Sequence, residues 1–223
     1  MTITSYGKKF NFDSFMSIMK DTVKNYKVPI ITLIAVQEKD PFKVLITTML
    51  SARTKDDITA AASNRLFSVA PTPQKLAKLS VNEIEKLIYP VGFYKTKAPR
   101  IKETSQMVLD YGEVPDTIEE LLKLPGVGRK TANLILGEAF KKDAICVDVH
   151  VHIIANRLGW VKTKSPKQSE LDLMKILPKI FWIKINTYLV AFGQAICTTA
   201  YPKCGRCPII MYCKYKKKDV SRI

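Results

Sequence analysis

Apolar residues near the start of the chain recur at the three- and four-residue spacing of one helix face. They are Phe12, Phe15, Met16, Met19 and Val23. A single helix would bury all five on one side. We therefore predict a first helix over 12–23, with Asp13 or Ser14 as its N-cap.

The same spacing continues along the chain and predicts a series of short helices. They span 42–50, 56–66, 81–89, 132–139, 149–157, 166–177 and 181–192. Another helix is expected where Thr117 and Glu120 form a capping box, followed by a buried stripe of Ile118, Leu121 and Leu122. The run 42–50 is rich in β-branched residues and also fits a buried strand, but the preceding Pro41 suits the first turn of a helix. No pair of strands joined by a hairpin turn is apparent, so the prediction is an all-α fold.

Charge adds a partner class to this picture. The 223 residues include 36 Lys and Arg against 20 Asp and Glu, a formal net charge of +16. Such a surplus attracts polyanions over long range, which favours nucleic acid or an anionic membrane surface, although a basic protein need have neither partner. No stretch is long and apolar enough to span a bilayer. The N-terminus lacks the pattern of a signal peptide, so we expect an intracellular, reducing compartment such as cytoplasm or nucleoid.

Four of the five cysteines lie close together near the end of the chain. Cys197, Cys204, Cys207 and Cys213 follow the pattern C-x6-C-x2-C-x5-C. In a reducing compartment such cysteines favour metal ligation over disulfides. The spacing alone fits tetrahedral zinc or a [4Fe–4S] cluster about equally well. The fifth cysteine, Cys146, lies in an apolar run and is expected to be a small buried residue.

A glycine-containing turn separates two of the predicted helices. It reads Leu124-Pro125-Gly126-Val127-Gly128-Arg129-Lys130. Gly126 and Gly128 allow a tight turn and a close approach of backbone to a ligand. Their amides precede a helix N-terminus, which favours an anion such as a DNA phosphate, and Arg129 adds positive charge. A plain tight turn between two helices is the alternative.

These motifs together resemble those of the endonuclease III family. The segment L-P-G-V-G-R-K-T-A, residues 124–132, is similar to the helix-hairpin-helix of that family, and V-D-V-H, residues 147–150, is similar to its V-D-T-H segment. The cysteine spacing is the one with which the family holds a [4Fe–4S] cluster. The resemblance extends from about Phe12 to Lys216.

The resemblance implies a chemical pair, Lys130 and Asp148. An amine can attack the sugar carbon as the damaged base leaves, and the resulting Schiff base permits elimination of the 3′ phosphate. A carboxylate can stabilise the developing positive charge and transfer protons. Without the resemblance, a phosphate-contacting or solvated lysine is the favoured interpretation of Lys130. Asp148 is equally the N-cap of the helix 149–157.

Two further segments resemble the parts of the family that fill the gap left by an extruded nucleotide. The first is L-S-A-R-T-K-D, residues 50–56, with Arg53 where the family carries glutamine. The second is V-G-F-Y-K-T-K-A, residues 91–98, with Phe93 for leucine and Lys95 for asparagine. Arg53 can bind an opposing base edge, and Phe93 can stack or wedge, or else be a core aromatic. These departures leave the preferred lesion and the preferred opposite base open.

The expected architecture is a two-lobed helix-hairpin-helix glycosylase fold. A six-helix barrel lobe spans 32–142, and an iron–sulfur cluster lobe joins 1–31 to 143–223. In the cluster lobe, Lys203 and Arg206 lie between the cysteines as candidate DNA contacts. His150 and His152 are expected to be structural.

The predicted function is a monomeric, bifunctional DNA glycosylase/AP lyase for oxidised pyrimidines in double-stranded DNA. The alternatives are a mismatch or uracil glycosylase and a non-catalytic DNA-binding module.

Overall fold

The computed structural model describes residues 2–5, 8–24, 26 and 40–223. The chain divides into two compact units, one formed by residues 1–28 and 145–223 and the other by residues 29–144. The start of the predicted barrel lobe, residue 32, lies outside the described residues.

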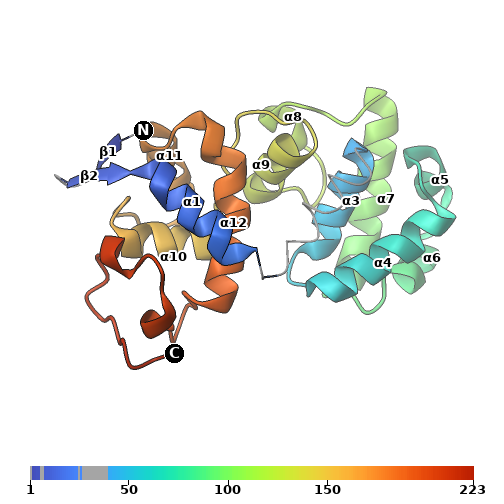
Figure 1. Ribbon diagram of the computed structural model, residues 1–223. Coiled ribbons are helices and arrows are strands. Elements are labelled where there is room, and N and C mark those ends of the chain that lie inside the picture. Colours follow the sequence, from blue (N-terminus) through green and yellow to red (C-terminus); the bar gives the residue numbers. More distant parts are fainter. Residues whose placement is uncertain (1, 6–7, 25, 27–39) are drawn as a thin grey trace. The chain divides into compact units, whose positions relative to one another are not determined.

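The unit 29–144 is helical throughout its described part (Figure 1). Its helices are α3 (Pro41–Ser51), α4 (Asp56–Val69), α5 (Pro73–Lys78), α6 (Val81–Ile88), α7 (Tyr94–Tyr111), α8 (Ile118–Leu121) and α9 (Arg129–Glu138). Helix α7 packs against α3, α5 and α6, and α3 also packs against α4 and α9. One apolar core, which includes Leu45, Leu66, Ile101 and Ile135, joins these helices.

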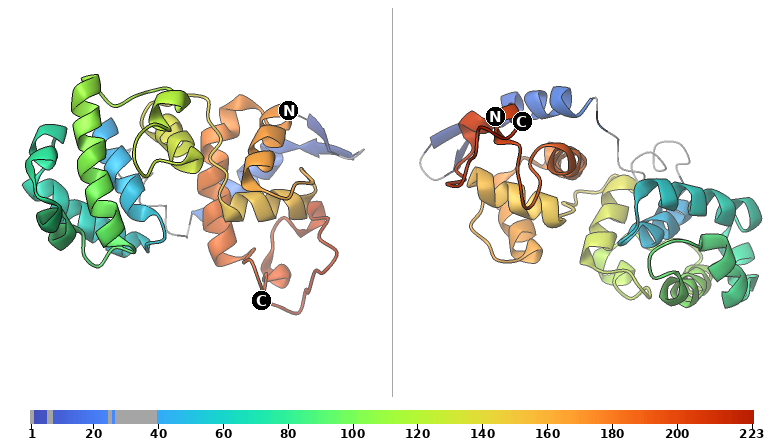
Figure 2. Two further views of the ribbon diagram at one scale, coloured as in Figure 1. Left: turned by 180° about the vertical axis from the view of Figure 1, so that it is seen from behind. Right: turned by 90° about the horizontal axis from the view of Figure 1, so that it is seen from below.

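The other unit combines the two ends of the chain. It contains β1 (Thr2–Ser5), β2 (Lys8–Asn11), α1 (Phe12–Val23), α10 (Val149–Leu158), α11 (Pro166–Ile176), η1 (Lys179–Phe181), α12 (Trp182–Ala195), η2 (Cys204–Arg206) and η3 (Ile210–Tyr212). Helix α12 packs against α1 and α10, as two views show (Figure 2). A second core around Phe15, Trp160, Leu189 and Phe192 holds this unit together.

Most predicted helices are confirmed, including 42–50 as helix rather than strand. Pro41 occupies the first turn of α3, and Asp40 caps that helix by accepting from the amides of Phe42 and Lys43. Buried positions on both faces explain the dense apolar run, because α3 is surrounded by other helices.

Several local predictions were wrong. Strands β1 and β2 pair as a short antiparallel sheet, although no strand pair was expected. Asn11 caps α1 in place of Asp13 or Ser14, because its side chain accepts from the Ser14 amide. Leu122 is exposed rather than buried, since α8 ends after a single turn.

Among the α-helices of the described residues, two were not predicted at all. Helix α5 follows the prolines that seemed only to end the preceding helix, since Pro73 occupies its first turn and Thr72 caps it. Helix α7 has 18 residues, contains Pro99 and is too polar along most of its length to show a clear stripe. Across the described residues, no helix is long and apolar enough to cross a bilayer.

Candidate functional site

The glycine turn links α8 to α9 as the sequence indicated. Gly126 has a φ of 82°, which favours glycine, and the Val127 amide donates to the Leu124 carbonyl at 3.1 Å. Leu124 and Val127 are buried and anchor the turn in the core. The Thr104 hydroxyl of α7 donates to the Pro125 carbonyl at 3.1 Å. The turn is therefore held by its own buried side chains and by a hydrogen bond from α7.

The N-terminus of α9 has the features of an anion site. Gly128 is its N-cap, so no side chain caps the helix, and a Cβ built there would meet nothing within 4 Å. Arg129 and Lys130 form the first turn, where the helix dipole also favours an anion, and Lys130 is exposed. A DNA phosphate or a sugar can therefore approach the amides and the lysine from solvent.

Asp148 is the N-cap of α10, as one of the two interpretations of its position predicted. Its Oδ1 accepts from the amide of His150 at 2.9 Å and from that of Val151 at 3.0 Å. The residue is only 9% exposed. The preceding Cys146 is buried, and its carbonyl accepts from Asn186 Nδ2 at 3.0 Å. Hydrogen bonds thus fix the backbone before Asp148, at Cys146, and after it, at the start of α10. Asp148 belongs to the unit 145–223 and Lys130 to the unit 29–144.

The structure brings the two wedge candidates together. Arg53 lies in the turn between α3 and α4, and Phe93 is the N-cap of α7. Both have left-handed backbones, with φ of 54° and 60°. The Arg53 guanidinium lies over the Phe93 ring, 5.4 Å from its centroid. Phe93 is 60% exposed, so its interpretation as a core aromatic was wrong.

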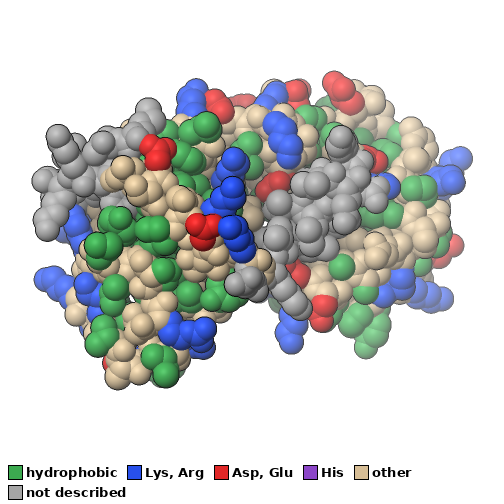
Figure 3. All heavy atoms as spheres, viewed as in Figure 1, with side chains coloured by type: hydrophobic (Ala, Val, Ile, Leu, Met, Phe, Trp, Pro, Cys, Tyr) green, Lys and Arg blue, Asp and Glu red, His purple; other side chains and the backbone are tan. Residues whose placement is uncertain are grey.

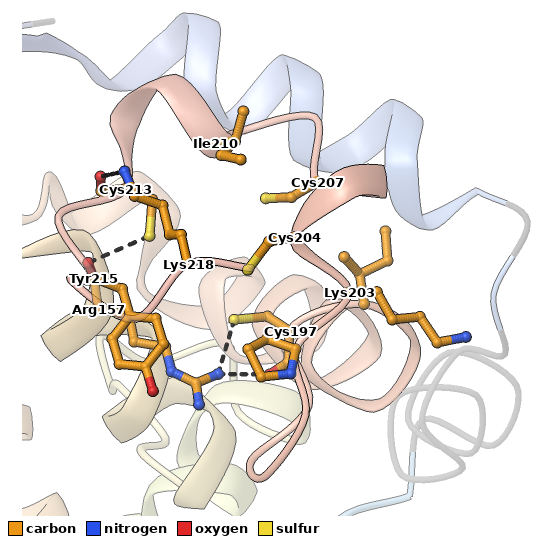
Figure 4. A pocket seen from close by; sticks show the side chains of 11 residues that line it. Arg157, Cys197, Lys203, Cys204, Cys207, Ile210, Cys213, Tyr215 and Lys218 are labelled. Atoms are coloured by element: carbon orange, nitrogen blue, oxygen red, sulfur yellow. Dashed lines mark hydrogen bonds between the residues drawn. The ribbon is translucent and has the colours of Figure 1, made fainter. Parts of the chain in front are cut away.

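The four cysteines of the C-terminal motif line one pocket (Figure 4). Cys204 and Cys207 come from η2 and its end, Cys197 follows α12 and Cys213 follows η3. Their sulfur atoms turn toward a common space in Figure 4. Within the described part of the chain, no three His, Cys, Asp or Glu side chains are arranged to hold a single metal ion.

Positive charge lines the same pocket. Arg157, which is buried, donates from Nη1 to Cys197 Sγ at 3.2 Å and to the Thr198 carbonyl at 2.8 Å. Burial raises the pKa of the Cys197 thiol, while the Arg157 contact opposes that rise. Burial also raises the pKa of Cys207, to about 11. Thiolates in this pocket therefore need compensating positive charge, which Arg157 and a bound metal group can supply.

The candidate phosphate contacts between the cysteines differ in exposure. Lys203 is partly buried, and its amine points away from the four sulfurs in Figure 4. Arg206 lies on η2 and is exposed. On the face drawn in Figure 3, Lys and Arg side chains lie on the surface of both units.

Sequence reasoning missed two residues that shape these sites. Arg157 lies in the last turn of α10, and only the fold brings it to Cys197, 40 positions later. Lys97 is similar: its Nζ donates to the carbonyls of Leu50 and Ala52 at 2.7 and 2.6 Å, across 47 and 45 positions. No local sequence signal marks either contact.

The histidines are in structural positions. His150 packs against Gly193 of α12, where an added Cβ would lie 2.5 Å from the ring Nδ1. His152 Nδ1 lies 2.7 Å from the Ser169 hydroxyl of α11. Both therefore join α10 to its neighbouring helices.

Comparison with known proteins places these features in a family. Residues 46–179 match the model of the HhH-GPD superfamily base excision DNA repair proteins. Endonuclease III of Thermotoga maritima is 50% identical over 184 residues, covering 82% of this chain and 86% of that protein.

Solved structures give the same relationship. A trapped covalent intermediate of endonuclease III with DNA aligns with a TM-score of 0.80 at 33% identity, covering 91% of this chain and 94% of that chain. A thermostable thymine-DNA glycosylase aligns with a TM-score of 0.71 at 26% identity, covering 91% of this chain and 98% of that chain. The chain therefore belongs to the HhH-GPD superfamily of base excision DNA repair proteins and, within it, to the endonuclease III family.

Proposed function

We propose that the protein is a bifunctional DNA glycosylase and AP lyase of base excision repair that removes oxidised pyrimidines from duplex DNA. The observation that carries this function is Lys130, an exposed amine on the first turn of a helix that no side chain caps. An anion held by those amides would place a DNA backbone beside a nucleophile.

In the proposed reaction, the neutral Lys130 amine attacks C1′ of the extruded nucleotide. The N-glycosidic bond breaks, its electron pair leaves with the base, and a proton from the medium or an acid neutralises the base. The C1′–O4′ bond of the sugar then breaks, the proton released by the attacking amine goes to O4′, and an iminium forms at C1′. Loss of a proton from C2′ expels the 3′ phosphate, and hydrolysis of the imine frees the enzyme.

Asp148 is proposed to support the charge changes at C1′. Its carboxylate stabilises the positive charge as the base leaves and then carries protons between the amine and the sugar. The two amide hydrogen bonds to Oδ1 fix its rotamer. Gly126, Gly128, Arg129, Lys203 and Arg206 would bind phosphates, and Arg53 and Phe93 would fill the gap in the duplex.

Borohydride trapping tests the lysine chemistry. Wild-type protein should form a covalent adduct with a thymine-glycol duplex, and Lys130→Ala should form none while binding an abasic-site duplex with unchanged affinity. Absence of an adduct from the wild type on every damaged duplex would exclude the lyase. Binding without nicking of an abasic site would instead identify a non-catalytic DNA-binding module.

A mismatch or uracil glycosylase is the second candidate. It is favoured by the alignment with the thymine-DNA glycosylase at 26% identity. Parallel trapping on thymine-glycol, uracil and thymine-mismatch duplexes distinguishes the two. Adducts that form faster on uracil or the mismatch would replace the first proposal with the second.

We further propose that Cys197, Cys204, Cys207 and Cys213 hold a [4Fe–4S] cluster. Four soft sulfur donors around one pocket suit iron–sulfur ligation, and the Arg157 guanidinium offsets the negative charge of a thiolate-bound cluster. When bound, the group would fix the loop that carries Lys203 and Arg206. Iron and sulfide analysis of protein purified without oxygen should give about four of each per chain. Stoichiometric zinc would refute the cluster.

The protein is also proposed to act as a monomer in a reducing compartment, where cysteine ligands stay unoxidised. Light scattering at the concentration of the trapping assay measures its oligomeric state.

A further inference from the structure

Two turns of the unit 29–144 lie against each other. One joins α3 to α4 and contains Arg53, and the other joins α6 to α7 and contains Gly92 and Phe93. The Gly92 amide donates to the Thr54 hydroxyl at 3.1 Å. A Cβ added to Gly92 would lie 2.5 Å from the Arg53 carbonyl oxygen, so only glycine permits this approach.

Lys97 joins the same two turns. It lies in the first turn of α7, four residues after Phe93, and its amide donates to the Phe93 carbonyl at 3.0 Å. Its Nζ reaches the Leu50 and Ala52 carbonyls and the Thr54 hydroxyl, at 2.7, 2.6 and 3.3 Å. The ammonium has three donors, and all three are directed at the end of α3 and the turn that follows it.

The carbonyls it binds belong to the end of α3, where they have no partner within the helix. Ser51 is the last residue of α3, so Leu50 lies in its final turn and Ala52 is its C-cap. A cation is favoured at a helix C-terminus. Lys97 thus holds the C-terminus of α3 and the first residue of the turn that follows in place.

We propose that Lys97 is a positioning residue that locks the two turns together, so that Arg53 and Phe93 enter the DNA as a stacked pair. Without the amine, only the Gly92–Thr54 hydrogen bond and the contact between Arg53 and Phe93 would join the two turns. The proposal rests on the proposed function, because the joined turns have this role only if the protein acts on bases extruded from a duplex. It adds a residue to that machinery that neither touches the DNA nor carries the chemistry.

Lys97→Met tests the proposal, since methionine keeps the apolar stem and removes the donors. Displacing a positioned group by about an ångström can cost up to a hundredfold in rate. We therefore expect the variant to lose about ten- to a hundredfold in single-turnover excision from duplex DNA. Borohydride trapping on single-stranded DNA with an abasic site should be unchanged, because no base has to be extruded there. Lys97→Arg should recover most of the duplex activity.

Lys102 provides a matched control on the same helix. Its Nζ donates to the Ala77 and Leu79 carbonyls at 2.8 and 2.5 Å, at the end of α5 and away from both turns. Lys102→Met removes a comparable set of hydrogen bonds and should leave the ratio of duplex to single-stranded activity unchanged. In a Phe93→Ala background, Lys97→Met should cost much less than in the wild type.

Three results would overturn the proposal. They are an equal loss on duplex and single-stranded DNA in Lys97→Met, a duplex-selective loss in Lys102→Met, and full duplex activity in Lys97→Met. A wild type that traps neither substrate refutes the proposed function instead, so the two failures are distinguishable.

Discussion

Asp148 combines a structural task with a proposed chemical one, and the two can be separated. Asparagine is as good an N-cap as aspartate, whereas alanine at an N-cap costs about 1 kcal/mol. We expect Asp148→Asn to keep the free energy of unfolding and to lose excision activity, because the amide carries no charge. Asp148→Ala should lower the free energy of unfolding and also lose excision activity. Urea unfolding and single-turnover excision measure the two effects.

If Asp148→Asn is fully active, the carboxylate charge has no part in the reaction and the residue is only a cap. Ser165→Ala serves as a control, since Ser165 caps α11 in the same way. That change should lower the free energy of unfolding without altering excision.

Lys97 should also leave a signature in the pH dependence of stability. Burial lowers its pKa from 10.5 to about 8. Between these values the unfolded chain holds a proton that the folded chain has lost, so the free energy of unfolding contributed by Lys97 rises from pH 8 to 10.5. The difference in unfolding free energy between wild type and Lys97→Met should therefore shift in favour of the wild type across this window. A difference that does not change with pH would contradict the lowered pKa.

At the scale of elements, the hairpin between α8 and α9 contains two glycines with different tasks. Gly126 needs its positive φ, so Gly126→Ala should destabilise the protein by about 1–2 kcal/mol. Gly128 has a φ of −93° and open space around its Cβ position, so Gly128→Ala should cost less, only the roughly 0.5–1 kcal/mol by which alanine is a poorer N-cap than glycine.

The affinity for DNA should instead be lowered more by Gly128→Ala than by Gly126→Ala. A methyl group at Gly128 lies where a phosphate would approach the first amides of α9, so affinity for an abasic-site duplex should fall severalfold. Fluorescence anisotropy at fixed salt measures this. Unchanged affinity in Gly128→Ala would place the phosphate elsewhere.

Helix α7 shows why some elements escaped prediction. Its buried residues are Ala98, Ile101, Thr104, Ser105 and Val108, of which two are polar. Such a face gives little hydropathic contrast, and Pro99 argues locally against a helix. Packing against α3, α5 and α6 nonetheless holds the segment as a helix, although Pro99, the sixth residue of α7, removes one intrahelical hydrogen bond.

At the scale of the whole molecule, the net charge of +16 should make DNA binding strongly salt-dependent. Each phosphate contact contributes about 0.9 to the slope of log K against log salt. Arg129→Gln and Lys203→Gln should each reduce the slope by roughly that amount. Lys175→Gln is the control, because Lys175 already pairs with Asp172 at 3.0 Å on an exposed face of α11.

An equal reduction in the control and in either variant would show that the slope reports net charge alone. The specific phosphate contacts would then have to be sought elsewhere on the basic surface.

The helical fold, the glycine turn, the cysteine motif and the cap at Asp148 can all be read from the amino-acid sequence alone. These features depend on residues within a few positions of each other, where side-chain period, backbone freedom and capping chemistry act directly. The family resemblance came from the same short motifs.

Contacts between residues far apart in the chain, by contrast, depend on how the helices pack. Arg53 and Phe93 are 40 positions apart and form a pair because Lys97 and Gly92 close one turn onto the other. Arg157 reaches Cys197 only through the packing of α10 against α12. Such contacts arise from the way whole helices bury their apolar faces, and no local pattern in the chain records which partners that packing will select.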